Sequence, residues 1–315
     1  MNSWATEING PMVAVRALHF AATATVAGAL IFRAAVADPA LRREKKASLF
    51  VDSQIRKVAW IGLVLSLISG AAWLSLQASA MSGESYGEAL SSGVLLTVLD
   101  QTQFGLVSTV RLGLAILLAI CLWLDRRPLP RSLALVVGLC LVMSIAWTGH
   151  AGSTPDQLGY LHLTADALHL AAAAAWTGGL VSLVLLLQAV RPHGAVAASS
   201  ELAVVERFSA LGMISVATLI ISGGVNAWIL VGSLRGLLVT HYGWVLMAKL
   251  AVFAIMLAFA AINRFWLSPQ LALPASDAAT RTLTRNAMAE IGLVLFVFII
   301  VGVLGTLHPA AHLVQ

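Results

Sequence analysis

The stretch 166-DALHLAAAAAWTGGL-180 decides the fold, because it has the composition of a membrane-spanning helix and yet contains Asp166 and His169. The rest of the chain has the same character. Of its 315 residues, 59% are hydrophobic and 10% are charged, whereas a soluble domain has about 25% charged residues. The mean hydropathy is +0.91. The sequence therefore predicts an integral membrane protein, and polar residues within its spans are candidates for function.

Long apolar runs recur along the chain, each close to the ~20 residues that a helix needs to cross hydrocarbon. They cover 11–37, 58–80, 105–124, 132–149, 160–190, 208–232, 243–266 and 288–307. Their Gly, Ala and Leu content, without alternation of polar and apolar residues, favours a helical bundle over an outer-membrane barrel. We therefore predict an all-α polytopic bundle of eight transmembrane helices in a lipid bilayer.

Positive charges predict the orientation, since short cytoplasmic loops retain Lys and Arg. Basic residues follow the odd-numbered runs, whereas the opposite loops contain only Arg235. They are Arg42, Arg43, Lys45, Lys46, Arg56, Lys57, Arg126, Arg127, Arg131, Arg191, Arg207, Arg264, Arg281 and Arg285. Both termini are thus predicted on the periplasmic side of a bacterial inner membrane. The net charge of +5 follows from this bias, so no nucleic-acid partner is expected.

The chain contains an internal similarity. The segments 17-ALHFAATATVAGAL-30 and 167-ALHLAAAAAWTGGL-180 align His19 with His169 and Gly28 with Gly178. Other matched pairs are 67-LISGAAW-73 with 220-IISGGVNAW-228, Arg111 with Lys249, and His150 with His308. We predict a tandem repeat of two parallel four-helix halves, residues 1–157 and 158–315, related by an axis along the membrane normal.

The histidines gather on one side of the predicted topology, where all except His193 fall at the periplasmic end. His162, Asp166 and His169 are spaced i, i+4, i+7, so they share one helix face. Neutral imidazole is a common ligand of transition metals, and a carboxylate can ligate the ion or orient an imidazole. The candidate metal ligands are His19, His150, His162, Asp166, His169 and His308.

Copper, as Cu(I) or Cu(II), is the metal that these residues favour. Cys140, Met143, Trp147 and His150 form a stripe that offers soft groups for Cu(I), although Cys140 and Met143 also suit ordinary apolar packing. His19 and His169 could instead form structural hydrogen bonds. Arg111 and Lys249 either shape the field of a polar cavity, pair with Asp166 or extend to the membrane surface.

From residue 160 to about 309 the sequence resembles the copper resistance protein D (CopD/PcoD) family. The similar segments are LHLAAAAAWTGGL, RFSALGMISVATLIISGGVNAW (207–228), THYGWVLMAKL (240–250), INR (262–264) and HP (308–309). The first half is similar more loosely, through RALHF and WTGHA (147–151). The resemblance implies copper transport between periplasm and cytoplasm, with a role in copper homeostasis and resistance. It also implies a small periplasmic copper-binding partner of the CopC type.

We therefore expect a copper transporter of the inner membrane rather than an enzyme. Uptake is the favoured direction, because the candidate ligands cluster at the periplasmic entrance. The sequence has no Gly-rich phosphate-binding loop, which argues against direct coupling to ATP. Two alternatives stay open. One is a haem-binding or quinone-linked redox protein with His19–His150 and His169–His308 as axial pairs. The other is a copper sensor or assembly factor that binds the ion without moving it.

Overall fold

The computed structural model describes residues 9–91, 93–125, 127–190, 198–272 and 277–313. Throughout these ranges the regular structure is helical, and eight helices are long and apolar enough to cross a membrane. The predicted all-α bundle of eight spans is therefore confirmed. His193, Arg126 and Arg191 lie outside the described residues.

The long helices are α1 (Gly10–Phe32), α3 (Lys45–Ser82), α6 (Gln103–Trp123), α7 (Pro128–Met143), α8 (Asp156–Val190), α9 (Ala198–Val231), α11 (His241–Ile262) and α12 (Asp277–Leu304). Short helical elements connect or extend them: η2 (Arg33–Ala37), α2 (Asp38–Ala40), α4 (Tyr86–Ser91), α5 (Val94–Gln101), η3 (Ser144–Thr148), η4 (His150–Ser153), α10 (Leu234–Val239), η6 (Asn263–Leu267), η7 (Ser268–Ala272) and η8 (Ala310–His312).

Several helices extend beyond the apolar runs that predict them. α3 begins at Lys45 rather than near residue 58, and α9 begins at Ala198 rather than near 208. Residues predicted in loops that lie in these helices or in α12 are Lys45, Lys46, Arg56, Lys57, Arg207, Arg281 and Arg285. The loop assignment was wrong for these residues because Lys and Arg are good helix formers. Their long side chains reach water while the helix continues past the hydrocarbon.

The starts of α6 and α11 are built alike. The Thr102 hydroxyl accepts a hydrogen bond from Gly105 N at 2.9 Å, and the Thr240 hydroxyl accepts one from Gly243 N at 3.0 Å. A Cβ on Gly105 would lie 2.0 Å from the carbonyl oxygen of Val98, and one on Gly243 would lie 2.1 Å from that of Leu237. These glycines therefore let the preceding short helices, α5 and α10, fold back against the start of a span.

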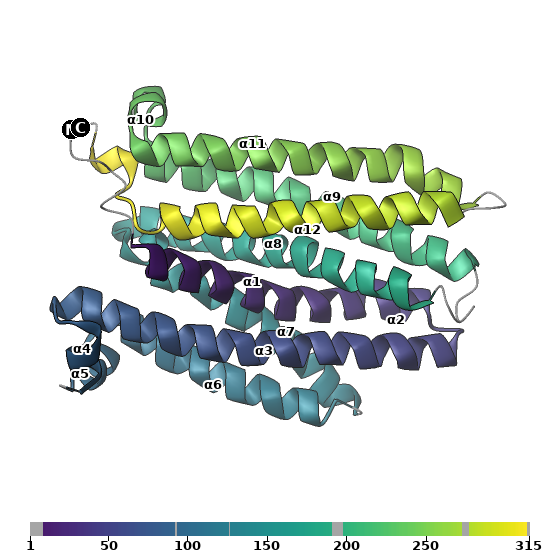
Figure 1. The fold of residues 1–315 in the computed structure, drawn as a ribbon, viewed down its shortest axis with the longest axis horizontal. Helices are drawn as coiled ribbons and strands as arrows, with labels where there is room; N and C mark the ends of the chain where they lie inside the picture. Colours follow the sequence, from purple (N-terminus) through teal and green to yellow (C-terminus); the bar gives the residue numbers. More distant parts are fainter. Residues whose placement is uncertain (1–8, 92, 126, 191–197, 273–276, 314–315) are drawn as a thin grey trace.

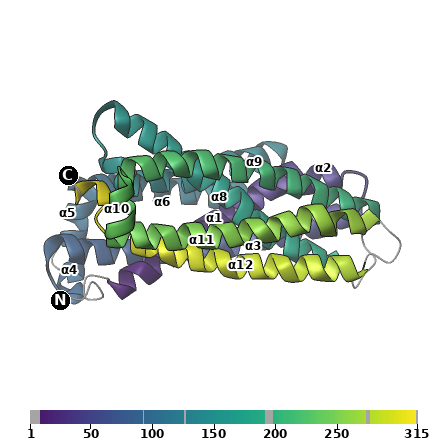
Figure 2. The same cartoon turned by 90° about the horizontal axis from the view of Figure 1, so that it is seen from above.

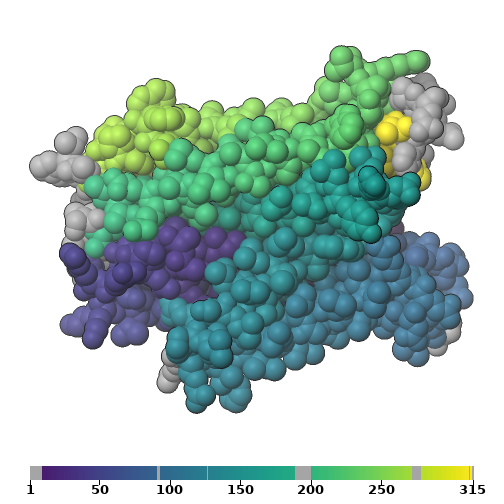
Figure 3. Space-filling model, turned by 180° about the vertical axis from the view of Figure 1, so that it is seen from behind, coloured from purple at the N-terminus to yellow at the C-terminus, as the bar shows by residue number. Residues whose placement is uncertain are grey.

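Helices α1 and α8 lie at the centre of the molecule and pack on one another (Figure 1). α3 and α7 pack on α1, with α6 beyond them, while α9 and α12 pack on α8, with α11 beyond them. In Figure 3 the later part of the chain, in green to yellow, lies along the earlier part, in purple to blue. Gly28 and Gly178 face each other across the central contact: a Cβ on Gly28 would lie 2.6 Å from the Cα of Gly178.

Large apolar side chains cover the outer faces of the spans. Ile221 on α9 is 70% exposed and Ile61 on α3 is 61% exposed. Hydrocarbon solvates such side chains as well as a protein core does, so their exposure is the expected state of a helix that faces lipid. The internal faces instead carry the buried polar residues, which include His19, Arg111, His162 and Glu290.

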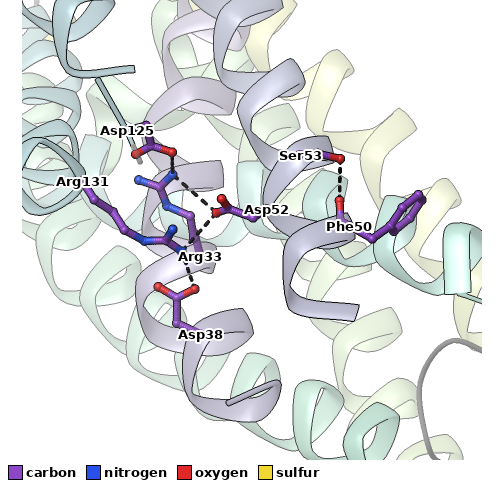
Figure 4. A network of polar contacts seen from close by, with 7 residues as sticks. All are labelled: Arg33, Asp38, Phe50, Asp52, Ser53, Asp125 and Arg131. Carbon is purple, nitrogen blue, oxygen red and sulfur yellow. Dashed lines mark hydrogen bonds and ion pairs between the residues drawn. The ribbon is translucent and has the colours of Figure 1, made fainter. Parts of the chain in front are cut away.

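The two ends of the bundle differ. α4, α5, α10 and η8 lie at one end, and α2 lies at the other (Figures 1 and 2). At the α2 end an ionic network joins the elements of the first half (Figure 4). Arg33 Nη1 lies 2.6 Å from Asp125 Oδ2, and Arg131 Nη2 lies 2.6 Å from Asp38 Oδ1 and 3.0 Å from Asp52 Oδ1.

Candidate metal-binding pocket

A pocket of about 220 Å³ lies among α8, α1, α9, α11 and α12, in the half of the bundle nearer α10. Four of the six predicted metal ligands line it: His150, His162, Asp166 and His169. Three of these come from α8, where their spacing places them on one helix face. α8 therefore contributes two imidazoles and a carboxylate to a single cavity.

Neighbouring hydroxyls fix the orientation of the two α8 imidazoles. Ser222 Oγ donates to the carbonyl oxygen of Thr218 at 2.6 Å, so it accepts from Nδ1–H of His169 at 3.1 Å. Thr154 Oγ1 lies 3.1 Å from the carbonyl oxygen of His150 and 2.7 Å from Nδ1 of His162. In both rings, therefore, a hydroxyl contact occupies Nδ1. The other nitrogen, Nε2, is left to face a metal ion, which neutral histidine can bind.

Asp166 is held by an amide. Asn226 Nδ2 donates to Asp166 Oδ1 at 3.1 Å, and both residues line the pocket. His150 lines the same pocket from η4, with its ring 6.5 Å from that of Tyr242 in an edge-on arrangement. The polar lining therefore comes from α8, α9, α11 and η4 together, which no single segment of sequence specifies.

Two cationic side chains, Arg16 and Lys249, also line the pocket. Arg16 Nη1 donates to the carbonyl oxygen of Gly305 at 2.9 Å, and its guanidinium lies 5.1 Å from the ring of Trp73. Among the described residues, Lys249 has no carboxylate within 4.0 Å. With its imidazoles neutral, the pocket has two positive charges against the single negative charge of Asp166. Charge balance for a bound cation therefore depends on Asp166.

His19 lies in a different pocket, of about 410 Å³, among the helices of the first half. Its Nδ1 faces the carbonyl oxygen of Ser66 and the hydroxyl of Ser69, each at 3.1 Å. Its Nε2 accepts from Arg111 Nη2 at 2.6 Å. Arg111 thus occupies the lone pair that a metal would need, so His19 is available as a ligand only when Arg111 moves away.

The surroundings of His19 and His169 match residue by residue up to this point. Ser69 and Ser222 hold the two rings, and a Cβ on Gly70 or Gly223 would lie 3.2 or 3.3 Å from Cε1 of the respective ring. The match ends at the position three residues before each histidine, which is Arg16 in α1 and Asp166 in α8. Only the second-half pocket therefore contains a carboxylate.

Other predicted residues lie apart from this pocket. His308 is exposed beyond the end of α12, and Cys140 is exposed on α7. Neither lines the pocket of His169. The pairs considered as axial ligands of haem are not brought to a common cavity, because His19 and His150 line different pockets and His308 lies outside that of His169.

Sequence reasoning did not single out Ser69, Ser222 or Asn226, which hold the predicted ligands. A signal for them was present, since both serines belong to the matched segments LISGAAW and IISGGVNAW. A serine repeated at the same place within an apolar span needs a hydrogen-bond partner on a neighbouring helix.

The pocket brings metal donors together, but these side chains do not surround one common ion position. In the described part of the chain, no three His, Cys, Asp or Glu side chains come close enough to hold a metal ion jointly.

Comparison with known proteins identifies the family. Residues 202–304 match the family described as Copper resistance protein D, and residues 5–160 match the one described as Copper resistance protein D-like, N-terminal domain. No solved structure matches the chain.

Three curated relatives are similar over long stretches. Copper resistance protein D of Pseudomonas syringae pv. tomato is 30% identical over 80% of this chain and 82% of its own length. Inner membrane protein YebZ of Escherichia coli (strain K12) is 30% identical over 94% of this chain and 98% of its own length. Copper transport protein CutJ of Bacillus subtilis (strain 168) is 29% identical over 58% of this chain and 34% of its own length. This chain is therefore a membrane protein of the copper resistance protein D family.

Proposed function

We propose that this protein carries copper ions across the bacterial inner membrane, in the direction of uptake, and is not an enzyme. The names of two relatives support the cargo and the process, since one is a copper resistance protein and another a copper transport protein. A third relative is named as an inner membrane protein, which supports the location. The basic residues at the α2 end support an orientation with both termini in the periplasm.

The pocket of α8 is the proposed site of entry, and one observation carries this assignment. His162 and His169 share a helix face and have Nδ1 held by a hydroxyl, while Asp166 lies between them in the same pocket. In the proposed order of events, copper reaches the pocket through His150 and the exposed His308, delivered by a small periplasmic protein of the CopC type. It then binds at Nε2 of His162 and His169.

His19 is a second copper ligand in this proposal, and its role depends on a change of conformation. Arg111 blocks its Nε2 at present, so His19 joins the pathway only in a conformation in which that contact is broken. The matched hydrogen bonds around His19 and His169 support two related four-helix halves, and a rearrangement between such halves is a common way to alternate access.

Metal analysis of the purified protein tests the site. We expect that the double variant His162→Ala, His169→Ala loses bound copper, while His241→Ala keeps it. His241 is a suitable control because it starts α11 at the same end of the molecule and its ring packs on Trp244 at 5.4 Å. Equal copper content in the wild type and the double variant would contradict the assignment.

Proteoliposomes test transport separately from binding. With copper supplied outside, the wild type is expected to accumulate metal in the lumen, and the double variant is not. A wild type that binds copper without moving it would instead support a sensor or assembly factor.

A further inference from the structure

A second cavity in the C-terminal half, separate from the proposed copper pocket, contains a buried acid. Its volume is about 390 Å³, and it lies among α8, α9, α11 with η6, and α12. Along each of these helices it follows the copper pocket toward the α2 end: on α8, for example, Ala173 lines the first and Trp176 the second. The ring of Trp176 packs edge-on against that of Phe253 at 5.9 Å.

Glu290 of α12 lines this cavity and is 1% exposed. Asn263 Nδ2 donates to Glu290 Oε1 at 2.8 Å, and Asn286 Nδ2 donates to Asn263 Oδ1 at 2.9 Å. The other oxygen, Oε2, is buried without a hydrogen-bond partner among the described residues. Asn263 begins the π-helical turn η6, an irregularity that is frequent at functional sites.

Within the described part of the chain, Glu290 has no positive partner, in contrast to the buried acid of the first half. Asp125 is 2% exposed and lies 2.6 Å from Arg33. No Lys, Arg or His nitrogen of the described residues lies within 4.0 Å of the Glu290 carboxylate. Arg264 lines the same cavity, but its Nη1 donates to Ser209 Oγ at 2.5 Å. A buried carboxylate without a cation is costly, whereas a carboxyl group that holds a proton is not.

We propose that Glu290 is a proton-binding site whose proton exchanges through this cavity and serves as the coupling ion of the transporter. The ligand is a proton because the polar groups that line this cavity are the Glu290 carboxyl, the Asn263 amide, the Arg264 guanidinium and the hydroxyls of Ser209 and Ser268, which do not suit a soft metal. Binding converts the carboxylate to a carboxyl at Oε2, and release reverses this without electron transfer. The coupling role rests on the proposed copper transport, whereas the proton site stands independently of it.

The groups that face Glu290 are few, so its titration reports a defined site. From η6 come Asn263 and the cation Arg264, from α9 comes Ser209, and α8 contributes apolar side chains to the cavity. On α12 itself Asn286 is buried next to Asn263, while Arg281 and Arg285 are exposed.

Labelling with dicyclohexylcarbodiimide tests the proton site in the purified full chain. This apolar reagent modifies protonated carboxyl groups in apolar surroundings, and mass spectrometry locates the adduct. We expect labelling at Glu290 about tenfold stronger than at Asp125, and a fall of about tenfold for each pH unit above the midpoint, as for one titrating proton. The decay of the reagent itself is measured at each pH and the labelling rate is corrected for it.

Two variants keep this test conclusive. Glu290→Asp retains a titratable group and should label, whereas Glu290→Gln should lose the adduct on that peptide. Labelling of Glu290 no stronger than that of Asp125, or independent of pH, would overturn the proposal. Because labelling is measured on the wild type, misfolding of a variant does not affect this outcome.

Proteoliposomes with an internal pH dye test the coupling. Glu290→Gln is expected to lower copper-driven proton movement at least about tenfold, since removal of the titrating group removes its protonation step. Its bound copper should equal that of the wild type. Normal proton movement in this variant would refute the role of Glu290 and leave copper transport intact. Absence of copper movement in the wild type would refute transport and leave the labelling result valid.

Discussion

At the scale of single residues, the imidazole of His169 is positioned as much by a missing side chain as by hydrogen bonds. Ser222 holds Nδ1, and Gly223 leaves room for the ring, since a Cβ there would lie 3.3 Å from Cε1. That distance is tighter than ordinary van der Waals contact, so an added methyl group would push the ring by a few tenths of an ångström. Ligand geometry therefore depends on a residue that binds nothing itself.

Gly223→Ala is predicted to weaken copper binding by about tenfold, because loss of the supporting contacts of a ligand lowers metal affinity by about 10–100-fold. Titration of the purified variant with copper measures the change. Gly224→Ala is the matched control, since no atom lies within 4 Å of a Cβ at that neighbouring position. Equal affinity in the two variants would show that the His169 ring does not determine binding.

At the scale of helices, the contact between α1 and α8 depends on two glycines. A Cβ on Gly28 would lie 2.0 Å from the carbonyl oxygen of Ala174, and a Cβ on Gly178 would lie 2.7 Å from that of Ala24. Both are backbone atoms, which do not move aside as a flexible side chain does. The close approach of the central helices therefore requires glycine at these two positions, as small residues do in other membrane helix pairs.

Gly28→Ala is predicted to lower the free energy of unfolding by at least about 1–3 kcal/mol, the usual effect of overpacking. A thermal melt in detergent would show the loss. Gly113→Ala on α6 serves as the control, because nothing lies within 4 Å of a Cβ there. That variant should melt at or above the wild-type temperature, since alanine favours a helix over glycine. Similar melting of both variants would show that the central contact tolerates separation.

At the scale of the whole molecule, the α2 end is held differently in the two halves. In the first half Arg33, Asp125, Arg131, Asp38 and Asp52 tie η2, α2 and α3 to the residues beside α6 and α7 (Figure 4). In the second half the same end contains the Glu290 cavity and its amides. Among the described residues, no ionic network joins the helices of the second half at this end.

Asp125→Asn is predicted to destabilise the protein by about 3–5 kcal/mol, because it leaves the buried Arg33 without its closest partner. Denaturant unfolding in detergent measures the difference. Asp38→Asn is the control: its side chain is 40% exposed, and a surface ion pair contributes only about 0–1 kcal/mol. Equal losses in the two variants would mean that burial does not distinguish these ion pairs.

Much of the architecture was predictable from the sequence, because a membrane leaves few choices. Apolar runs of sufficient length must be helices, since no water satisfies their backbone groups. The face shared by His162, Asp166 and His169 was predictable for a similar reason, because helical spacing fixes it. The lengths of α3 and α9 were not predictable from the sequence, because charged residues beyond the hydrocarbon can continue a helix or end it.

The sequence by itself determined the fold class, the family and the polar residues that share one face of α8, since these depend on local composition and periodicity. Only the tertiary structure decided that His19 and His169 line separate pockets, that Arg111 occupies Nε2 of His19, and that Glu290 is buried with no ion pair to any described residue. The physical reason is that each of these depends on which helices pack together. Contacts between helices that are distant in the sequence cannot be predicted from the spacing of residues within a single helix.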